Sequence, residues 1–322
     1  MVNSTHPGGR SAVLLIGAAV ALIVLACAGC GRGEGPRPPG PLRVVVSIAP
    51  LTGLVRALAP PDATVTTLIP AGRSLHGYEM TPTDLAAVGT ADVLVYVGLG
   101  LEPSVDRVLG IHPSKRRRVV CFARVAGVED PHAGHDHHEH GDDEHHDHGH
   151  AVDPHLWLDP QLVARLIPEV SDAIEAALQG MDALTVAGES RLREARNRLR
   201  AEVEAIDAEH QERLGPFKGA AIVTHHNAFG RLADRYGFTI AAVIRPVEGA
   251  EPTPAAVAAA VDAIRRENAR AVFFEPQFDA AAAEAIARAA GVPVGTLDPE
   301  GRSDWFALMR SNLDELTRLL AR

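Results

Sequence analysis

The chain has 322 residues, of which 46% are hydrophobic and 4% aromatic, and its formal net charge at pH 7 is −10. This length allows two ordinary domains, each with its own core. The charge balance excludes a broad basic surface for nucleic acid, because the one basic run, residues 115–118 (KRRR), has the pattern of a solvated turn before a strand.

Residues 1–30 have the pattern of an export signal rather than that of a transmembrane anchor. Arg10 is the only charged residue before a long apolar run, which ends in small residues directly before Cys30. This ending resembles a bacterial lipoprotein signal, in which the cysteine is acylated and becomes the mature N-terminus. Cys27 is a weaker alternative, because bulky Leu25 stands where such signals have a small residue.

Residues 31–41 (GRGEGPRPPGP) form a Gly/Pro-rich tether that cannot pack a core. If Cys27 and Cys30 belong to the signal, only Cys121 remains, and the mature fold contains no disulfide. Cys121 lies in the apolar segment VVCFA and is interpreted as part of the core. We therefore expect an exported chain, anchored by its N-terminal lipid on the outer face of the cytoplasmic membrane or in the periplasm.

From Leu42 onwards, apolar segments alternate with helical ones. Strands are predicted at residues 43–50, 63–70, 91–98 and 118–125, with helices at 51–58 and 81–89. The second half has predicted strands at residues 220–226, 239–246, 269–277 and 292–299, with helices at 228–237, 253–268, 279–291 and from about Asp304. Continuous Val and Ile runs indicate strands buried on both faces, hence parallel sheets with helices on each side. The sequence therefore predicts an α/β fold with two lobes of mainly parallel sheet, residues 42–181 and 215–322.

Residues 182–214 predict one long helix between the lobes. A helix of this length spans roughly 45–50 Å, more than one small lobe needs. We expect it to join the two lobes and to limit their hinging. A coiled-coil dimerisation arm is the alternative, but the apolar stripe is short for that role. The stripe recurs at steps of three and four and consists of Leu192, Ala195, Leu199, Val203, Ile206, His210 and Leu214.

His76 lies in the loop between a predicted strand and a helix whose start is well marked. Thr81 is the predicted N-cap, Pro82 the first helical residue and Asp84 the capping-box partner. His76 therefore stands just beyond the carboxyl end of a strand.

Three further places have similar positions in the pattern. His155 lies between two Asp-Pro turns, His225 and His226 follow a strand, and Asp298 follows another. Ligands of open α/β sheets bind beyond the strand ends. Imidazole nitrogens and one carboxylate suit Zn²⁺ in tetrahedral geometry. Each residue alone has an ordinary explanation as a loop or turn residue, so the argument comes from their equivalent places.

The motifs LHGYEMTPTDLAAVGTADVLVYVGLGLE, DPHLWLDP, VTHHNAFGRLADRYGF, FFEPQF and LDPEG occur in an order that resembles zinc-type substrate-binding proteins of ABC importers. The resemblance covers nearly the whole chain from Leu42. It implies two α/β lobes joined by one long helix, with a metal between them. The implied ligands match His76, His155 and His226, and a carboxylate at Asp298 or a water completes the shell.

The family's third ligand directly precedes the xAF segment, which selects His226 over His225. His225 is then expected to line the cleft or to contact a ligand. Some relatives have an acidic residue before the first histidine, but this chain has Leu75, which cannot be a ligand. Glu275, after the predicted strand ARAVFF, is a further candidate for the fourth position.

The ligand set favours Zn²⁺ as the bound metal. Three imidazoles with at most one carboxylate suit zinc, whereas Mn²⁺ prefers more oxygen ligands and a higher coordination number. A manganese-binding protein, or one for another divalent metal in the same type of transporter, is the alternative.

Residues 132–150 (HAGHDHHEHGDDEHHDHGH) contain nine of the 16 histidines and six carboxylates. This composition predicts a loop without a core, which cannot be the tight site because its ligands lack rigid neighbours. We expect it to collect or sense zinc weakly, and a solvated insertion with incidental metal affinity is the alternative. The accessory ligands are His132, His135, His137, His138, His140, His145, His146, His148 and His150.

The predicted function is extracytoplasmic Zn²⁺ binding and delivery to the membrane permease of an ABC importer. We expect a monomer and no enzyme, since the chain has no HExxH helix and no G-x-S-x-G nucleophile turn. A zinc-storage lipoprotein is the alternative function, and release to a permease distinguishes the two.

Overall fold

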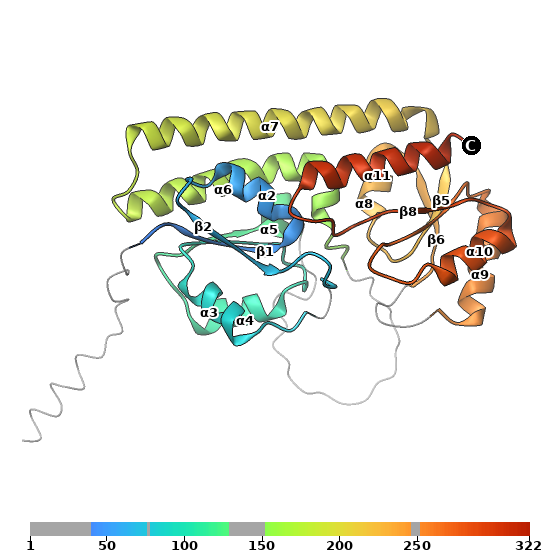
Figure 1. Ribbon diagram of the computed structural model, residues 1–322, viewed down its shortest axis with the longest axis horizontal. Coiled ribbons are helices and arrows are strands. Elements are labelled where there is room, and N and C mark those ends of the chain that lie inside the picture. Colours follow the sequence, from blue (N-terminus) through green and yellow to red (C-terminus); the bar gives the residue numbers. More distant parts are fainter. Residues whose placement is uncertain (1–39, 76–77, 129–151, 246–251) are drawn as a thin grey trace, which may run out of the picture. The chain divides into compact units, whose positions relative to one another are not determined.

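Two four-stranded parallel sheets form the frame of the computed structural model, which describes residues 40–75, 78–128, 152–245 and 252–322 (Figure 1). The first has the order β2-β1-β3-β4 and the second β6-β5-β7-β8. Every strand pair in both is parallel, which confirms the predicted fold class. The strands are β1 (Arg43–Ile48), β2 (Thr64–Ile69), β3 (Val93–Tyr96), β4 (Arg118–Cys121), β5 (Ala221–Thr224), β6 (Thr239–Val243), β7 (Val272–Phe274) and β8 (Val294–Thr296).

Helices cover both faces of the first sheet. In Figure 1, α3 and α4 lie on the opposite side of that sheet from α2 and α6. The α-helices are α2 (Ala49–Leu58), α3 (Pro82–Thr90), α4 (Pro103–Ile111), α5 (Phe122–Ala126), α6 (Pro160–Gly180), α7 (Val186–Leu214), α8 (Gly230–Tyr236), α9 (Pro254–Glu267), α10 (Ala281–Ala290) and α11 (Trp305–Leu320). Two 3-10 turns, η1 (Leu156–Leu158) and η2 (Gly215–Phe217), complete the elements. Within the described ranges, no helix combines the length and the apolar composition that crossing a membrane requires.

The start of α3 has the predicted capping box. The Thr81 side chain accepts a hydrogen bond from the backbone of Asp84, and the Asp84 carboxylate accepts one from the backbone of Thr81. The strand predicted at residues 118–125 is shorter, because it ends at Cys121 and the short helix α5 follows. Phe122, the first residue of this helix, is fully buried in the core. The predicted elements include neither α4 nor α6.

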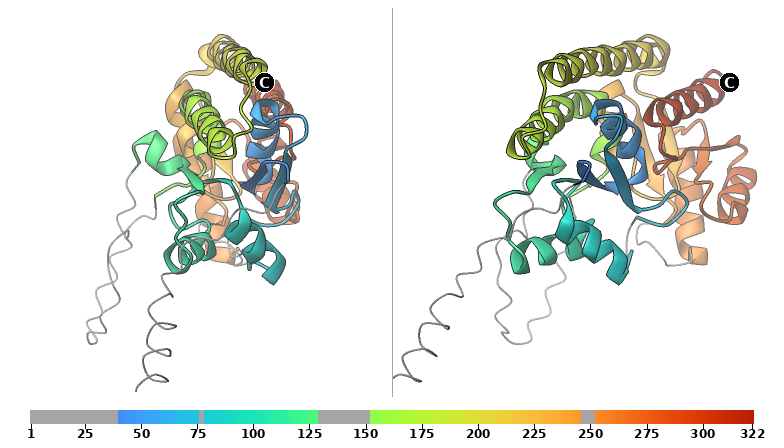
Figure 2. Two further views of the ribbon diagram at one scale, coloured as in Figure 1. Left: turned by 90° about the vertical axis from the view of Figure 1, so that its left-hand side faces the viewer. Right: turned by 60° about the vertical axis from the view of Figure 1, so that its left-hand side comes forward.

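Helix α7 begins at Val186 and not at Asp182. Asp182 has a φ of 53°, in the left-handed region, so the helix cannot start there. The Thr185 side chain accepts a hydrogen bond from Gly188 N and caps the helix instead. The seven stripe residues predicted from the sequence are the buried residues of α7. They face the chain's own helices, since α7 packs against α6, α2 and α11, and Figure 2 shows α6 and α7 side by side.

The C-terminal helix α11 connects the two halves of this unit. It packs against β8 of the second sheet and also against α7 and α2, and α2 belongs to the first sheet's layer. The boundaries of the two predicted lobes stay a prediction. Beyond the strand ends, His226 after β5 contacts Glu275 after β7 and also His155 in the segment before α6. The turn after β8 contacts that same segment through Trp157 and the loop after β2 through Leu75.

Candidate metal centre

Two of the predicted ligands, His155 and His226, meet in the structure. Their Nε2 atoms are 3.2 Å apart, and their rings meet edge to face with centroids 5.0 Å apart. His155 is the residue before η1, and His226 follows β5. These two residues are 71 positions apart in the chain, so the fold is what places their imidazoles together.

Asp153 orients the ring of His155. Its Oδ1 atom accepts a hydrogen bond from His155 N at 2.9 Å and lies 2.7 Å from His155 Nδ1. Two guanidinium nitrogens of Arg231, on α8, donate to the backbone oxygen of Asp153 at 2.8 and 3.1 Å. The imidazole of His155 is only 2% exposed, so the Asp153 carboxylate selects the tautomer with the proton on Nδ1.

Glu275 has the same relationship to His226. Glu275 Oε1, directly after β7, forms a short hydrogen bond with His226 Nδ1 and accepts another from His226 N at 3.2 Å. Its side chain is 1% exposed. Glu275 therefore lies behind the imidazole, on the side away from Nε2. In this position it orients His226, a different role from the fourth ligand that the sequence suggested as one option.

The tautomers leave two lone pairs facing each other. When both Nδ1 atoms carry protons, each Nε2 presents its lone pair towards the other ring across 3.2 Å. Two such lone pairs repel unless a cation lies between them or one ring gains a proton. Two nitrogen ligands of a tetrahedral zinc, each at about 2.0–2.1 Å, are about 3.3–3.4 Å apart. The observed separation is close to that value.

The electrostatic surroundings keep His155 neutral. Burial lowers the pKa of His155, and this effect outweighs the opposing influence of Asp153. Burial raises the pKa of Asp153, but hydrogen bonds from His155 and the charge of Arg231 outweigh that effect and hold the pKa below its ordinary value. A neutral imidazole backed by an ionised carboxylate is the form that binds a metal ion.

His225 points elsewhere. Its ring stacks on Phe278 with centroids 4.7 Å apart and an angle of 10° between the planes. Its backbone oxygen accepts a hydrogen bond from Arg245 N at 2.7 Å. Of the two adjacent histidines, His226 is the one that faces His155.

Asp298 lies in a turn after β8, and its Oδ1 atom accepts three hydrogen bonds. The donors are Gln277 Nε2 at 2.7 Å, Glu300 N at 3.0 Å and Gly301 N at 2.9 Å. Among the described residues, no three His, Cys, Asp or Glu side chains are arranged to hold a metal ion, so the structure does not bring Asp298 into a group with the two imidazoles. Its assignment as a ligand stays a prediction.

Several predicted site residues lie outside the described ranges. They are His76, lipidation residue Cys30 and the nine loop histidines at positions 132–150. Leu75, the neighbour of His76, is described and is 2% exposed.

The sequence interpretation did not identify Asp153 as a partner of His155, and it did not consider Glu300 as a site residue. An Asp two residues before a histidine is a signal of an Asx turn, which could have indicated the hydrogen bond between Asp153 and His155. Glu300 accepts a hydrogen bond from Leu75 N, 225 positions away, and no local pattern indicates such a contact.

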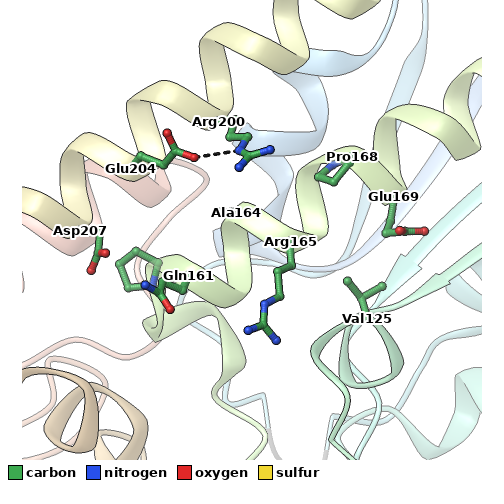
Figure 3. Close-up of a pocket in the computed structure, with 10 residues that line it drawn as sticks. Val125, Gln161, Ala164, Arg165, Pro168, Glu169, Arg200, Glu204 and Asp207 are labelled. Atoms are coloured by element: carbon green, nitrogen blue, oxygen red, sulfur yellow. Dashed lines mark hydrogen bonds and ion pairs between the residues drawn. The ribbon is translucent and has the colours of Figure 1, made fainter.

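The pocket in Figure 3 is separate from the imidazole pair. It has a volume of about 560 Å³ and lies between α6 and α7, with no histidine in its lining. Two of its charged side chains are already paired inside it, because Arg200 Nε is 2.8 Å from Glu204 Oε1. A groove of about 1030 Å³ between α3 and α4 is lined by apolar residues such as Leu85 and Ile111. Neither contains His155 or His226.

Comparison with known proteins gives consistent matches. Residues 44–319 match the model of the family described as zinc-uptake complex component A, periplasmic. The zinc-binding lipoprotein AdcA of Streptococcus pneumoniae serotype 4 is 26% identical over 316 residues, which cover 94% of this chain and 60% of that protein. The high-affinity zinc uptake system protein ZnuA of Bacillus subtilis is 26% identical over 316 residues, covering 94% of this chain and 95% of that protein.

A solved structure named as the crystal structure of ZnuA is also similar. Its TM-score is 0.68 at 25% identity, and the match covers 87% of this chain and 99% of that chain. The chain spans less than two thirds of the AdcA relative and nearly the whole length of the two ZnuA proteins.

Proposed function

Because this chain belongs to the family of the periplasmic component A of zinc-uptake complexes, we propose that it binds Zn²⁺ outside the cytoplasm and delivers it to the permease of an ABC importer. One observation carries this proposal. The Nε2 atoms of His155 and His226 are 3.2 Å apart, and a carboxylate contacts Nδ1 of each ring. This is the arrangement by which carboxylates orient histidine ligands of zinc.

The proposed ligands are His76, His155 and His226, with Asp298 or a water in the fourth position. Imidazole-rich tetrahedral sites favour zinc over metals that prefer oxygen ligands. For Asp298 to bind the metal, a carboxylate oxygen must turn from its present hydrogen bonds or the second oxygen must serve. A water as the fourth ligand requires neither change. An Asp298→Asn variant distinguishes the two options, because the loss of the carboxylate weakens zinc binding if Asp298 is a ligand and leaves it unchanged if a water is.

Capture requires neutral rings, so metal binding releases a proton only from a histidine that is protonated beforehand. The lowered pKa of His155 keeps that imidazole ready to bind at neutral pH. Release to the permease then requires that the ligand-bearing segments separate. The hydrogen bonds that orient both rings lie within the protein and do not depend on the metal.

The remaining parts of the proposal concern the surroundings of the site. Cys30 carries a lipid that holds the chain at the membrane, in keeping with the word lipoprotein in the name of the AdcA relative. The nine histidines of residues 132–150 collect zinc weakly ahead of His155 in the chain. The protein acts as a monomer and performs no catalysis.

Zinc titration by calorimetry tests the proposal. The soluble form starting at Leu42 is compared with a form that lacks residues 132–150 and with His76→Ala. His112→Ala is the matched control, because His112 is an exposed histidine at the end of α4. We expect one tight site that survives loop deletion and His112→Ala and is lost in His76→Ala. Tight binding that disappears with the loop and ignores His76 would contradict the proposal.

A further inference from the structure

The four strands of the first sheet begin side by side, at the place where the chain enters the described fold. The register pairs Arg43 with Thr64 and Val93 with Arg118. Backbone hydrogen bonds join the strand starts, since Arg118 N donates to Asp92 O at 2.8 Å and Asp92 N donates to Arg43 O at 2.9 Å. We call this part of the surface the strand-start edge, which comprises residues 42–43, 62–64, 92–93 and 115–119.

The basic run at residues 115–118 lies at this edge, and one buried arginine anchors it. Arg117 is 6% exposed, and its guanidinium donates to Gly89 O at 2.9 Å and to His112 O at 3.3 Å. The other side chains of the run are exposed, namely Lys115, Arg116 and Arg118. The protein therefore presents three cationic side chains from a backbone that is held in place.

Further basic side chains lie beside the run. Arg56 and Arg191 line a hollow of about 660 Å³ next to the start of β2. Arg191, on α7, donates to the backbone at the end of α2 at 3.1 Å, and Figure 1 shows α7 beginning at the end of the fold where β1 begins. Asp92 is paired with Arg43 at 3.3 Å, and Asp62 is an exposed carboxylate at this edge. The basic residues here outnumber these two carboxylates, so the local charge is positive.

Exposed apolar side chains accompany the positive charge. Ile111, at the end of α4, is 64% exposed, and Val119, directly after the basic run, is 43% exposed. These two residues flank the run in the chain. Cationic side chains next to exposed apolar ones are typical of a surface that lies on lipid headgroups.

The rest of the chain carries the opposite charge. The formal net charge of the whole chain is −10, and residues 132–150 contain six carboxylates and no lysine or arginine. This acidic segment joins the described fold beyond the other ends of the strands, because residue 128 follows β4 and α5 and residue 152 precedes Asp153. An anionic surface therefore attracts the strand-start edge and repels the acidic segment.

We propose that the strand-start edge is a membrane-contacting surface, at which Lys115, Arg116 and Arg118 bind the phosphate groups of anionic phospholipids. Leu42 follows Cys30 by 12 positions, and a stretch of that length reaches roughly 40 Å at most. A lipid on Cys30 therefore keeps this edge within reach of the bilayer. The inference rests on the membrane attachment that is part of the proposed function. It adds a second contact, and an acyl chain together with a basic surface attaches a protein more stably than one acyl chain alone.

This contact also orients the metal centre. His226 follows the carboxyl end of β5, and the loop after the carboxyl end of β2 contacts the turn after β8 through Leu75. The strand-start edge lies at the opposite ends of the first sheet's strands. Bound to lipid by this edge, the protein directs the pair formed by His155 and His226 away from the bilayer.

Binding to vesicles tests the proposal with the form that starts at Leu42, which carries no lipid. This form keeps every helix and strand of the described residues, and residues 41–322 form one compact unit. Co-sedimentation is measured with vesicles of phosphatidylcholine alone and of phosphatidylcholine mixed with phosphatidylglycerol. The edge variant combines Lys115→Gln, Arg116→Gln and Arg118→Gln.

The matched control variant removes the same charge from another face. It combines substitutions of three exposed arginines on α9 and α10, namely Arg265→Gln, Arg266→Gln and Arg288→Gln. Zinc titration of both variants reports whether the fold and the metal centre are intact, since none of the six residues contacts the two imidazoles.

We expect the unchanged form to bind the vesicles that contain phosphatidylglycerol and to lose this binding at high salt. The edge variant binds these vesicles about 10–100-fold more weakly, because each basic side chain near an anionic surface contributes separately to the attraction. The control variant keeps the affinity of the unchanged form. Zinc binding is the same in all three proteins.

Equal losses in the edge and control variants would overturn the proposal, because net charge alone would then explain vesicle binding. Equal binding to both kinds of vesicle would also overturn it. Self-association without vesicles that disappears in the edge variant would assign this surface to a second copy of the chain instead. Mass spectrometry of the full chain from bacterial membranes tests the attachment itself. A Cys30 without lipid would overturn that part of the proposed function, and the vesicle result, obtained without lipid on the protein, is a separate outcome.

Discussion

His155 and His226 face each other with their Nε2 atoms 3.2 Å apart, and each ring is held from behind by a carboxylate. The two carboxylates come from different places, Asp153 from the segment before η1 and Glu275 from the end of β7. This symmetry of contacts leaves the Nε2 atoms of both rings facing each other. These two imidazoles are thus oriented by groups of the protein itself, which reduces the ordering that metal binding requires of them.

Replacing Glu275 by Gln is expected to weaken zinc binding by about tenfold or more. The amide keeps the size of the side chain and can still accept from His226 Nδ1, but it removes the negative charge that makes the imidazole a better ligand. Chelator competition measures the change. Glu169→Gln is the control, because Glu169 is exposed on α6. Unchanged affinity in Glu275→Gln would mean that its charge does not act on the metal.

Zinc affinity is expected to be nearly constant from pH 8 to about pH 6.5 and to fall at lower pH. Ordinary imidazoles titrate near pH 6.5, and burial lowers the pKa of His155, so protons compete at this ring only in more acidic solution. Titrations at a series of pH values in a buffer without zinc affinity test this. A fall centred above pH 7 would contradict the assignment of a buried, neutral His155.

Much of the fold follows from local patterns that the sequence displays. The capping box of Thr81 and Asp84 and the buried stripe of α7 are both set by neighbours within a few turns, and both are present as predicted. The end of β4 was not predictable in the same way. The central residues VVCFA of the segment RVVCFARV are all apolar and contain no turn residue, so the sequence does not mark the point after Cys121 where the strand ends and helix α5 begins.

In the candidate site, too, the sequence indicated some residues and only the tertiary structure revealed others. The place of His155 between two Asp-Pro turns and the position of His225 and His226 after a strand were enough to single out these histidines, and the family resemblance then selected His226. The partners that orient them required tertiary structure, since Glu275 lies 49 positions from His226. Glu300 and Leu75 are separated by 225 positions, and no spacing rule connects them. Contacts of this kind depend on how two sheets are placed, which periodicity does not encode.

Asp207→Asn is expected to destabilise the fold by about 2 kcal/mol. Asp207, on α7, accepts from Arg235 Nε at 2.8 Å and Nη2 at 2.5 Å, and Arg235 belongs to α8. Denaturant unfolding measures the difference. Asp172→Asn is the control, because the pair of Asp172 with Arg196 is exposed and contributes about 0–1 kcal/mol. Equal effects of the two substitutions would contradict the importance of this link.

The pH dependence of the Asp207 effect has a definite sign. Burial raises the pKa of Asp207, but hydrogen bonds from Arg235 and Tyr236 outweigh that effect and lower it overall. A lowered folded-state pKa means that the stabilisation is present at neutral pH and is lost as the pH falls through the folded-state value. The difference between the unchanged protein and Asp207→Asn therefore shrinks in acid. A difference in the free energy of unfolding between the two proteins that grows as the pH falls would contradict this prediction.

Glu102→Gln is expected to gain stability relative to the unchanged protein as the pH rises. Burial raises the pKa of Glu102 to about 7, against the opposing hydrogen bonds from Val97 N and Gly98 N. The protonated form therefore favours folding fully below about pH 4.5, and this contribution is lost as the pH rises through 7. The neutral amide avoids that loss, which amounts to about 3 kcal/mol. Urea unfolding at pH 5 and pH 8 tests this, and an identical difference at both pH values would contradict it.

The position of the bound metal tests the central claim most directly. A crystal of the zinc-loaded protein, with anomalous diffraction recorded on both sides of the zinc absorption edge, locates the ion without reference to any ligand assignment. The account predicts one strong peak about 2.0–2.1 Å from Nε2 of both His155 and His226. Zinc found only among residues 132–150, with the space between the two imidazoles empty, would contradict it.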